Sequence, residues 1–120
     1  MKVLVADDSG VMRKIIIRSL NAVGVTDVVE APDGDKAFEQ FQQNSVDLVL
    51  TDWNMPGKSG IELAAAIRAT GSRTPIIMIT TEAERPRIIE AIQAGVNDYL
   101  TKPFENEALQ GKLTKFCAAV

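Results

Sequence analysis

Five short apolar segments constrain the fold of this chain more than any other feature of its sequence. They recur at intervals of roughly twenty to twenty-five residues, which suits strands that are joined by crossover helices. One of them reads PIIMIT and is apolar almost throughout, as expected of a strand covered on both faces. We therefore predict five parallel strands, at residues Val3–Ala6, Asp27–Ala31, Asp47–Thr51, Pro75–Thr80 and Asp98–Thr101.

The segment after the first strand predicts an amphipathic helix. Its apolar side chains recur at helical spacing, and Gly24 follows at the position where a helix C-terminus favours glycine. We expect the apolar stripe to face the sheet, with Met12, Ile15, Ile16, Leu20 and Val23 as its members. The basic side chains of the segment, Arg13, Lys14 and Arg18, are expected outside this stripe.

Local signals mark the ends of further helices. Ser59 and Glu62 form a capping box, in which each side chain satisfies a backbone amide of the first turn. Another helix is expected from about Glu84 to Ala94, because Pro86 is tolerated in a first turn and Gly95 favours a stop. A last helix follows, with Leu109, Leu113 and Phe116 on one face. So many strands and helices in 120 residues predict a doubly wound (βα)5, flavodoxin-like α/β sandwich of strand order 2-1-3-4-5.

Composition narrows the class of protein. A chain of 120 residues, 46% of them apolar, is typical of one globular domain, and no apolar run is long enough to span a membrane. The formal charge of −3 argues against nucleic acid binding, and the absence of His argues against zinc or histidine chemistry. A single Cys117 agrees with a reducing compartment, so we expect a cytoplasmic monomer.

Polar residues stand at the ends of four predicted strands. Asp7 and Asp8 follow the first strand, Asp52 follows the third, Thr80 ends the fourth and Lys102 follows the fifth. Sites in such sheets form outside the carboxyl ends of the strands, and the first and third strands flank the point where the strand order reverses. The three carboxylates should therefore converge. Because they would repel one another, a cation is expected, and their oxygen ligands suit Mg²⁺.

This arrangement suits phosphoryl transfer. A carboxylate beside Mg²⁺ and the Lys102 ammonium, with the Thr80 hydroxyl nearby, could attack phosphorus while the cations neutralise the phosphoryl oxygens. Taken singly, each residue has an ordinary explanation, since an Asp after a strand is commonly a turn former or a helix cap. The prediction depends on their combination.

Four segments carry a resemblance to a known family: VADDS, TDWNMPGKSG, MITTEA and YLTKPF. Together they resemble the receiver domain of two-component response regulators, in particular the single-domain chemotaxis regulators, over the whole chain. The resemblance implies that Asp52 takes a phosphoryl group from a histidine kinase. It also implies that Asp8, Asp52 and the backbone carbonyl of Asn54 bind Mg²⁺, with Asp7 acting largely through water. Lys102 would pair with the phosphate, and the Lys102–Pro103 peptide bond is expected to be cis.

The resemblance further implies a switch and an output face. Thr80 would turn toward the phosphate and let Tyr99 turn inward, although Tyr99 could equally be ordinary strand packing. Asn54 and Glu82 would flank the water that hydrolyses the phosphate. A target protein, the flagellar motor switch among the candidates, would bind the face of the fourth helix, fifth strand and fifth helix. Two lysines of that face match partner-binding positions of the family, or form a solvated basic surface: Lys112 and Lys115.

Other functions remain open on the sequence alone. An aspartyl-phosphate phosphatase of the haloacid dehalogenase type also uses a strand-end Asp, but it requires Asp-x-Asp where this chain has adjacent acids. A pseudo-receiver would only bind partners, and the complete acidic set argues against it. An FMN-binding flavodoxin would need a phosphate cradle that the first loop lacks. We expect residues 1–120 to form a receiver domain without an output domain, which catalyses only its own phosphorylation and dephosphorylation.

Overall fold

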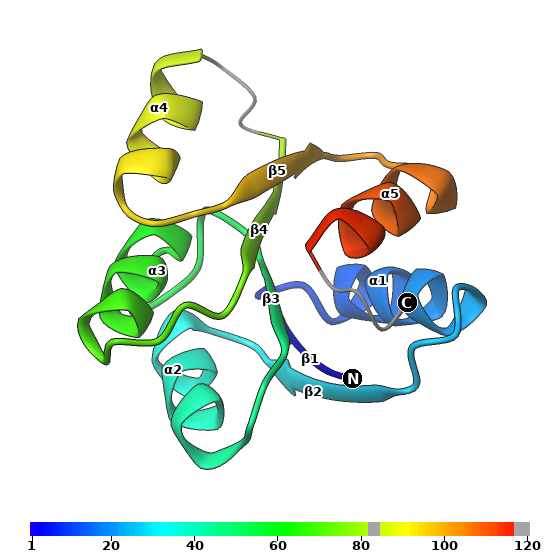
Figure 1. The fold of residues 1–120 in the computed structure, drawn as a ribbon, viewed down its shortest axis with the longest axis horizontal. Coiled ribbons are helices and arrows are strands. Elements are labelled where there is room, and N and C mark those ends of the chain that lie inside the picture. Colours follow the sequence, from blue (N-terminus) through cyan, green and yellow to red (C-terminus); the bar gives the residue numbers. More distant parts are fainter. Residues whose placement is uncertain (82–84, 117–120) are drawn as a thin grey trace.

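The computed structural model describes residues 1–81 and 85–116. Within these residues strands and helices alternate, as the sequence predicts (Figure 1). Their bounds are β1 (Lys2–Ala6), α1 (Gly10–Ala22), β2 (Asp27–Ala31), α2 (Gly34–Gln43), β3 (Leu48–Thr51), α3 (Gly60–Ala69), β4 (Ile76–Thr80), α4 (Arg85–Gln93), β5 (Asp98–Thr101) and α5 (Asn106–Phe116). No helix in the described part of the chain is both long and apolar enough to cross a bilayer.

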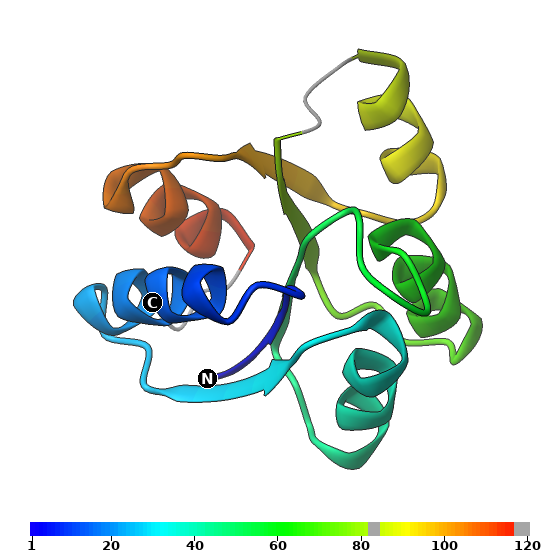
Figure 2. The ribbon, with the colours of Figure 1, turned by 180° about the vertical axis from the view of Figure 1, so that it is seen from behind.

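The strands form one parallel sheet of order β2-β1-β3-β4-β5, which confirms the predicted doubly wound fold. Its central strands are apolar along most of their length, as expected where helices cover both faces. Helices α1 and α5 lie on one face, and α2, α3 and α4 lie on the other, as the two opposite views show (Figures 1 and 2).

Each face of the sheet has its own apolar core. One core joins the sheet to α2, α3 and α4 through Ala37, Leu63, Ile67 and Ala91. The other joins it to α1 and α5 through Ile16, Leu20, Leu109 and Leu113. Alternate residues of each buried strand contribute to opposite cores, so Leu4 belongs to the first and Val5 to the second.

Several predicted helix ends are confirmed, whereas Glu84, the predicted start of the fourth helix, lies outside the described residues. Ser59 and Glu62 make both hydrogen bonds of a capping box at the start of α3. Gly24 and Gly95 follow α1 and α4 with positive φ angles of 93° and 108°, a region that favours glycine. The Lys102–Pro103 peptide bond is cis, as predicted.

One prediction about α1 is wrong. Ile15 was assigned to the buried stripe, yet it is 45% exposed, and Ile17 packs against the core instead. Arg13 lies outside the apolar core, as predicted, although its side chain is only 19% exposed because it contacts Glu30 of β2 and the Asp7 carbonyl after β1. The predicted third and fourth strands also begin one residue early, since neither Asp47 nor Pro75 belongs to a strand.

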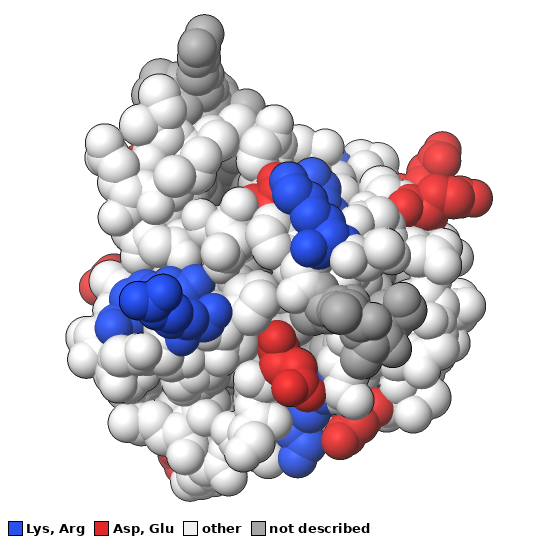
Figure 3. All heavy atoms as spheres, viewed as in Figure 1, with Lys and Arg blue, Asp and Glu red and all other residues white. Residues whose placement is uncertain are grey.

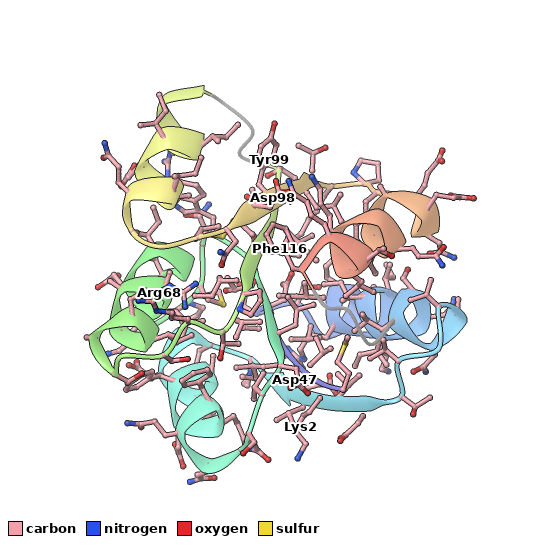
Figure 4. All side chains as sticks on the ribbon, in the orientation of Figure 1. Lys2, Asp47, Arg68, Asp98, Tyr99 and Phe116 are labelled. Atoms are coloured by element: carbon pink, nitrogen blue, oxygen red, sulfur yellow. The ribbon has the colours of Figure 1, made fainter. Side chains whose placement is uncertain are left out.

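A guanidinium joins two loops and a helix at the amino ends of β4 and β5. Arg68, in the last turn of α3, donates five hydrogen bonds of 2.8–3.1 Å to the carbonyls of Ser72, Thr74 and Gly95 and to the side chain of Asn97. All its N–H groups therefore have neutral acceptors. Figure 4 shows where Arg68 lies on α3. A Cβ atom at Gly95 would lie 2.6 Å from the Arg68 side chain. Glycine is therefore favoured at this position for two reasons, the positive φ angle and the close approach of Arg68.

Candidate functional site

Strand register brings the predicted site residues to one edge of the sheet. Ala6 of β1 pairs with Thr51 of β3, so Asp7 and Asp52 leave the sheet side by side. Thr80 of β4 pairs with Thr101 of β5, and Lys102 follows immediately. The backbone amide of Lys102 donates to the Thr80 carbonyl at 3.0 Å. The site is thus a direct consequence of strand order and register.

Asp7 is held at both carboxylate oxygens. Its Oδ1 accepts the backbone N–H of Ser9 at 2.9 Å, and its Oδ2 accepts the Lys102 ammonium at 2.9 Å. The Asp7 carbonyl accepts Nη1 of Arg13 at 2.7 Å, and its amide donates to the Ala31 carbonyl at 3.1 Å. Because Asp7 is only 1% exposed and already paired, it contributes mainly fixed charge and orientation.

Asp52 is more accessible, with 15% of its side chain exposed. Its Oδ1 accepts the backbone N–H of Trp53 at 2.7 Å, and its Oδ2 lies 3.2 Å from the Lys102 ammonium. The pKa of Asp52 is raised, mainly because burial disfavours the charged form. The negative charge of Asp7 also acts to raise it, whereas Lys102 and the Trp53 amide act to lower it. The carboxylate is therefore partly desolvated yet oriented at both oxygens, as a nucleophile requires.

Lys102 connects Asp7 and Asp52. Its ammonium is 2.9 Å from Asp7 and 3.2 Å from Asp52, with only 16% of the side chain exposed. Burial acts to lower the pKa of Lys102, but the hydrogen bond to Asp7 and the charge of Asp52 outweigh it, and the pKa is raised. The residue is a permanent cation at the carboxyl edge of the sheet.

Three carboxylates lie close enough to share a metal ion. Ligand oxygens of Asp7, Asp8 and Asp52 lie within 4.8 Å of one another. The single ammonium of Lys102 leaves two formal negative charges in this group, which is the charge that a divalent cation would neutralise. The donors are all hard oxygens, so the residues present fit Mg²⁺. Asp8 is exposed and leaves room for water ligands.

The remaining predicted residues lie at different depths. Thr80 is 2% exposed at the end of β4, Tyr99 in β5 is 37% exposed, and Asn54 is exposed in the loop after β3. Asn54 is thus at the correct edge of the sheet, whereas Tyr99 lies nearer the amino end of β5. Glu82, predicted to orient water, lies outside the described residues, as does Cys117.

The start of α2 supports the loop after β3. A Cβ atom at Gly34 would overlap the carbonyl of Lys58, and one at Gly57 would overlap the Asp35 carboxylate. The Gly34 amide donates to the Pro56 carbonyl at 3.2 Å, and Lys58 pairs with Asp35 at 3.3 Å. The loop that carries Asn54 therefore packs directly against a helix N-terminus, which fixes its path.

Two site contacts were missed from the sequence. Arg13 joins the Asp7 carbonyl to Glu30 of β2, which lies 3.1 Å from its Nε. The Arg87 guanidinium of α4 lies 5.0 Å from the centre of the Trp53 ring, which is 5% exposed. Each contact joins two different elements, α1 with β2 and α4 with the loop after β3. Only the topology could have indicated them.

An apolar pocket of about 260 Å³ adjoins the acidic group. Lys102 belongs both to the acidic group and to the lining of this pocket, which also includes Met12, Ile15, Thr81, Pro103 and Phe104. Ile15, which the sequence did not predict to be exposed, is one of the side chains that line this pocket.

Comparison with known proteins agrees with this geometry. A family model described as the response regulator receiver domain matches residues 3–114. The chemotaxis protein CheY of Pseudomonas aeruginosa is 45% identical over 117 residues, which cover 96% of this chain and 94% of that protein. The chemotaxis protein CheY-3 of Vibrio cholerae is 46% identical over 117 residues, with 96% and 90% covered.

Solved structures show the same fold. The chemotaxis response regulator CheY4 of Vibrio cholerae is similar to this chain with a TM-score of 0.88 and 34% identity, over 96% of this chain and 97% of that one. A Francisella response regulator receiver domain gives a TM-score of 0.88 and 33% identity, over 96% and 94%.

Proposed function

Because the chain belongs to the family of response regulator receiver domains, we propose that it is a phosphorylation-activated switch of a chemotaxis-type two-component system. In this proposal it takes a phosphoryl group from the phosphohistidine of a histidine kinase and then binds a target protein. It acts in the cytoplasm as a monomer. It is a signalling switch and no enzyme in the ordinary sense, since it would catalyse only its own phosphorylation and dephosphorylation.

The observation that carries the proposal is the position of Lys102 between Asp7 and Asp52, at 2.9 and 3.2 Å. A phosphoryl group on Asp52 would bring new negative charge to the side of the carboxylate where this ammonium already lies. Lys102 can then exchange part of its pairing with the carboxylates for pairing with phosphoryl oxygens, at little cost in reorganisation.

The transfer is a substitution at phosphorus. An oxygen of the Asp52 carboxylate forms a bond to phosphorus as the bond from phosphorus to the kinase imidazole breaks, and the imidazole nitrogen keeps the electron pair and is reprotonated. Lys102 and the N–H of Trp53 orient the carboxylate for this attack. Mg²⁺ at Asp8, Asp52 and the Asn54 carbonyl would neutralise the phosphoryl oxygens, with Asp7 acting largely through water.

Acetyl phosphate tests the proposal without a kinase. With Mg²⁺, the protein should form an acid-stable phosphoprotein that hydroxylamine cleaves, because the acidic group and Lys102 stabilise the attack by themselves. Asp52→Asn should abolish labelling. Asp27→Asn, which removes an equal charge at the far edge of the sheet, should leave it unchanged. Labelling that persists in Asp52→Asn would refute the assignment of the acceptor.

We further propose that phosphorylation reaches the target through Thr80 and Tyr99. The Thr80 hydroxyl would turn toward the phosphate, and Tyr99 would move inward from its 37% exposed position, altering the face of α4, β5 and α5. A flagellar motor switch protein is the target class that the chemotaxis relatives suggest.

The switch can be tested at one site because Tyr99 is the only tyrosine of the chain. Protein labelled with 3-fluorotyrosine should give one ¹⁹F resonance that shifts when beryllofluoride and Mg²⁺ are added. Thr80→Ala should suppress the shift while binding of beryllofluoride, followed by Trp53 fluorescence, persists. A full shift in Thr80→Ala would contradict this coupling.

Dephosphorylation is assigned to Asn54 and Glu82, which in the family flank the path of the attacking water. Substituting both should change the hydrolysis rate of purified phosphoprotein. An unchanged rate would remove them from the mechanism.

A further inference from the structure

A second charged cluster lies at the opposite end of β5 from Lys102. Asp98 is the first residue of β5, and two lysines of α5, three residues apart on one helix face, reach its carboxylate. The ammonium of Lys112 is 2.9 Å from Oδ2 and that of Lys115 is 3.5 Å from the same oxygen. Figure 4 shows Asp98 and Tyr99 together on the edge strand β5. In the space-filling view from the same side, only a small acidic area is visible in this region, next to basic side chains (Figure 3).

The two ion pairs differ in strength and exposure. The Asp98 side chain is 13% exposed and that of Lys112 is 28% exposed, and they form a hydrogen bond of 2.9 Å. Oδ1 of Asp98 accepts the backbone N–H of Tyr99 at 2.8 Å. Losing Lys112 would leave a carboxylate with little access to water, so this pair resists separation. Lys115 is 64% exposed and more distant, so its attraction to Asp98 is weak.

Electrostatics agree with this ranking. Burial acts to raise the pKa of Asp98, but the hydrogen bond from Lys112 and that from the Tyr99 amide outweigh it, so the pKa is lowered. The single negative charge of Asp98 is paired mainly with the Lys112 ammonium. One of the two lysine charges is therefore uncompensated, at the more exposed position.

We propose that Asp98 reserves Lys112 for the fold and leaves Lys115 as the ammonium that receives a carboxylate from an acidic segment of the partner protein. This inference rests on the proposed function, in which the partner binds the face of α4, β5 and α5. The partner class follows from charge complementarity: two ammonium groups share one carboxylate, beside the half-exposed ring of Tyr99, 6.0 Å from the Lys112 ammonium. Asp98 then determines how strongly acidic partners bind, although it contacts none of them.

The proposal predicts a specific pattern of suppression. Lys115→Met removes the receiving charge and should weaken binding of an acidic peptide. Asp98→Asn releases Lys112 and should strengthen it. In the double variant, the released Lys112 replaces the missing Lys115, so affinity should return to about the wild-type value. Hexaglutamate labelled with fluorescein serves as the probe, with hexaglutamine as the neutral control, in EDTA at low ionic strength.

Fluorescence anisotropy should show about three- to fivefold weaker binding for Lys115→Met and a similar gain for Asp98→Asn, as expected for one exposed ion pair. Asp27 supplies the matched control, because it begins the opposite edge strand β2 and is exposed. Asp27→Asn should give a smaller gain than Asp98→Asn, and should not rescue Lys115→Met.

Two results would overturn the proposal: wild-type affinity in Lys115→Met, or a gain in Asp98→Asn no larger than in Asp27→Asn. Thermal melts check that the variants fold, and Lys115→Met, altered at an exposed side chain, tests the first arm even if Asp98→Asn is unstable. Acetyl phosphate labelling is measured separately, with Mg²⁺ in place of EDTA, on the same protein preparations. Normal labelling without the affinity pattern refutes this inference alone, whereas absent labelling of wild type refutes the proposed function.

Discussion

Replacing Asp8 by Asn should stabilise the protein when no metal is present. Asp7 and Asp52 are both paired with Lys102, whereas Asp8 adds a third negative charge at the exposed side of the group. The folded chain therefore holds a repulsion that the unfolded chain lacks. Asp8→Asn removes that repulsion and keeps the shape of the side chain.

The size of the effect follows from the separation of the oxygens. Two unit charges 4.8 Å apart interact by about 3.5 kcal/mol at an effective dielectric constant of about 20. Exposure of Asp8 to solvent and the opposing charge of Lys102 reduce the net effect to about 1 kcal/mol. Mg²⁺ at about ten times its Kd should stabilise wild type by about 1.4 kcal/mol, because it binds only the folded cluster.

Urea melts of wild type and Asp8→Asn, each with EDTA and with excess Mg²⁺, measure both quantities. The variant should be more stable than wild type in EDTA and nearly indifferent to Mg²⁺. Asp27→Asn controls for the general loss of one negative charge. If Asp8→Asn is less stable in EDTA and responds to Mg²⁺ as wild type does, the three acids do not act as one metal site.

Three further predictions concern the scaffold. Gly34→Ala should destabilise the fold by about 1–3 kcal/mol in urea melts and weaken Mg²⁺ binding, because its Cβ would displace Lys58 and the loop that carries Asn54; wild-type stability would show that the loop yields freely. Arg68→Met should cost about 2–4 kcal/mol, since five hydrogen bonds lose their donor, and Arg68→Lys should recover little of it. Because the pKa of Asp98 is lowered in the folded state, its stabilising effect should be complete above about pH 4 and be lost as the pH falls through the folded-state value. Urea melts from neutral to acid pH should therefore show a shallower loss of stability in Asp98→Asn, and parallel curves would exclude this linkage.

The fold and the centre of the site could be predicted from the sequence because both depend on strand pattern. Apolar segments locate the strands, and the crossover helices between them restrict the strand order. Once β1 and β3 are neighbours, Asp7 and Asp52 must meet at the edge where those strands end. Capping signals are local, which is why the start of α3 was also predicted correctly.

Contacts between distant elements were beyond the sequence. Arg13 was predicted only to lie outside the apolar stripe, because helical periodicity separates apolar from polar faces but does not reveal a partner such as Glu30 on β2. For Lys112 the sequence left two interpretations open, a partner-binding residue or part of a solvated basic surface. Its pairing with Asp98 depends on the packing of α5 against β5, which the sequence does not reveal. Four of the five hydrogen bonds of Arg68 are accepted by loop carbonyls, which have no signature in the sequence.

Mapping the phosphorylated residue tests the central claim most directly. Phosphoramidate contains a bond from phosphorus to nitrogen, as phosphohistidine does, and should phosphorylate the protein in the presence of Mg²⁺. Borohydride then reduces an aspartyl phosphate to homoserine, which peptide mass spectrometry can locate. The account predicts homoserine at position 52 and unmodified aspartate at Asp7 and Asp8. Homoserine at either of those positions, or at none of the three, would contradict it.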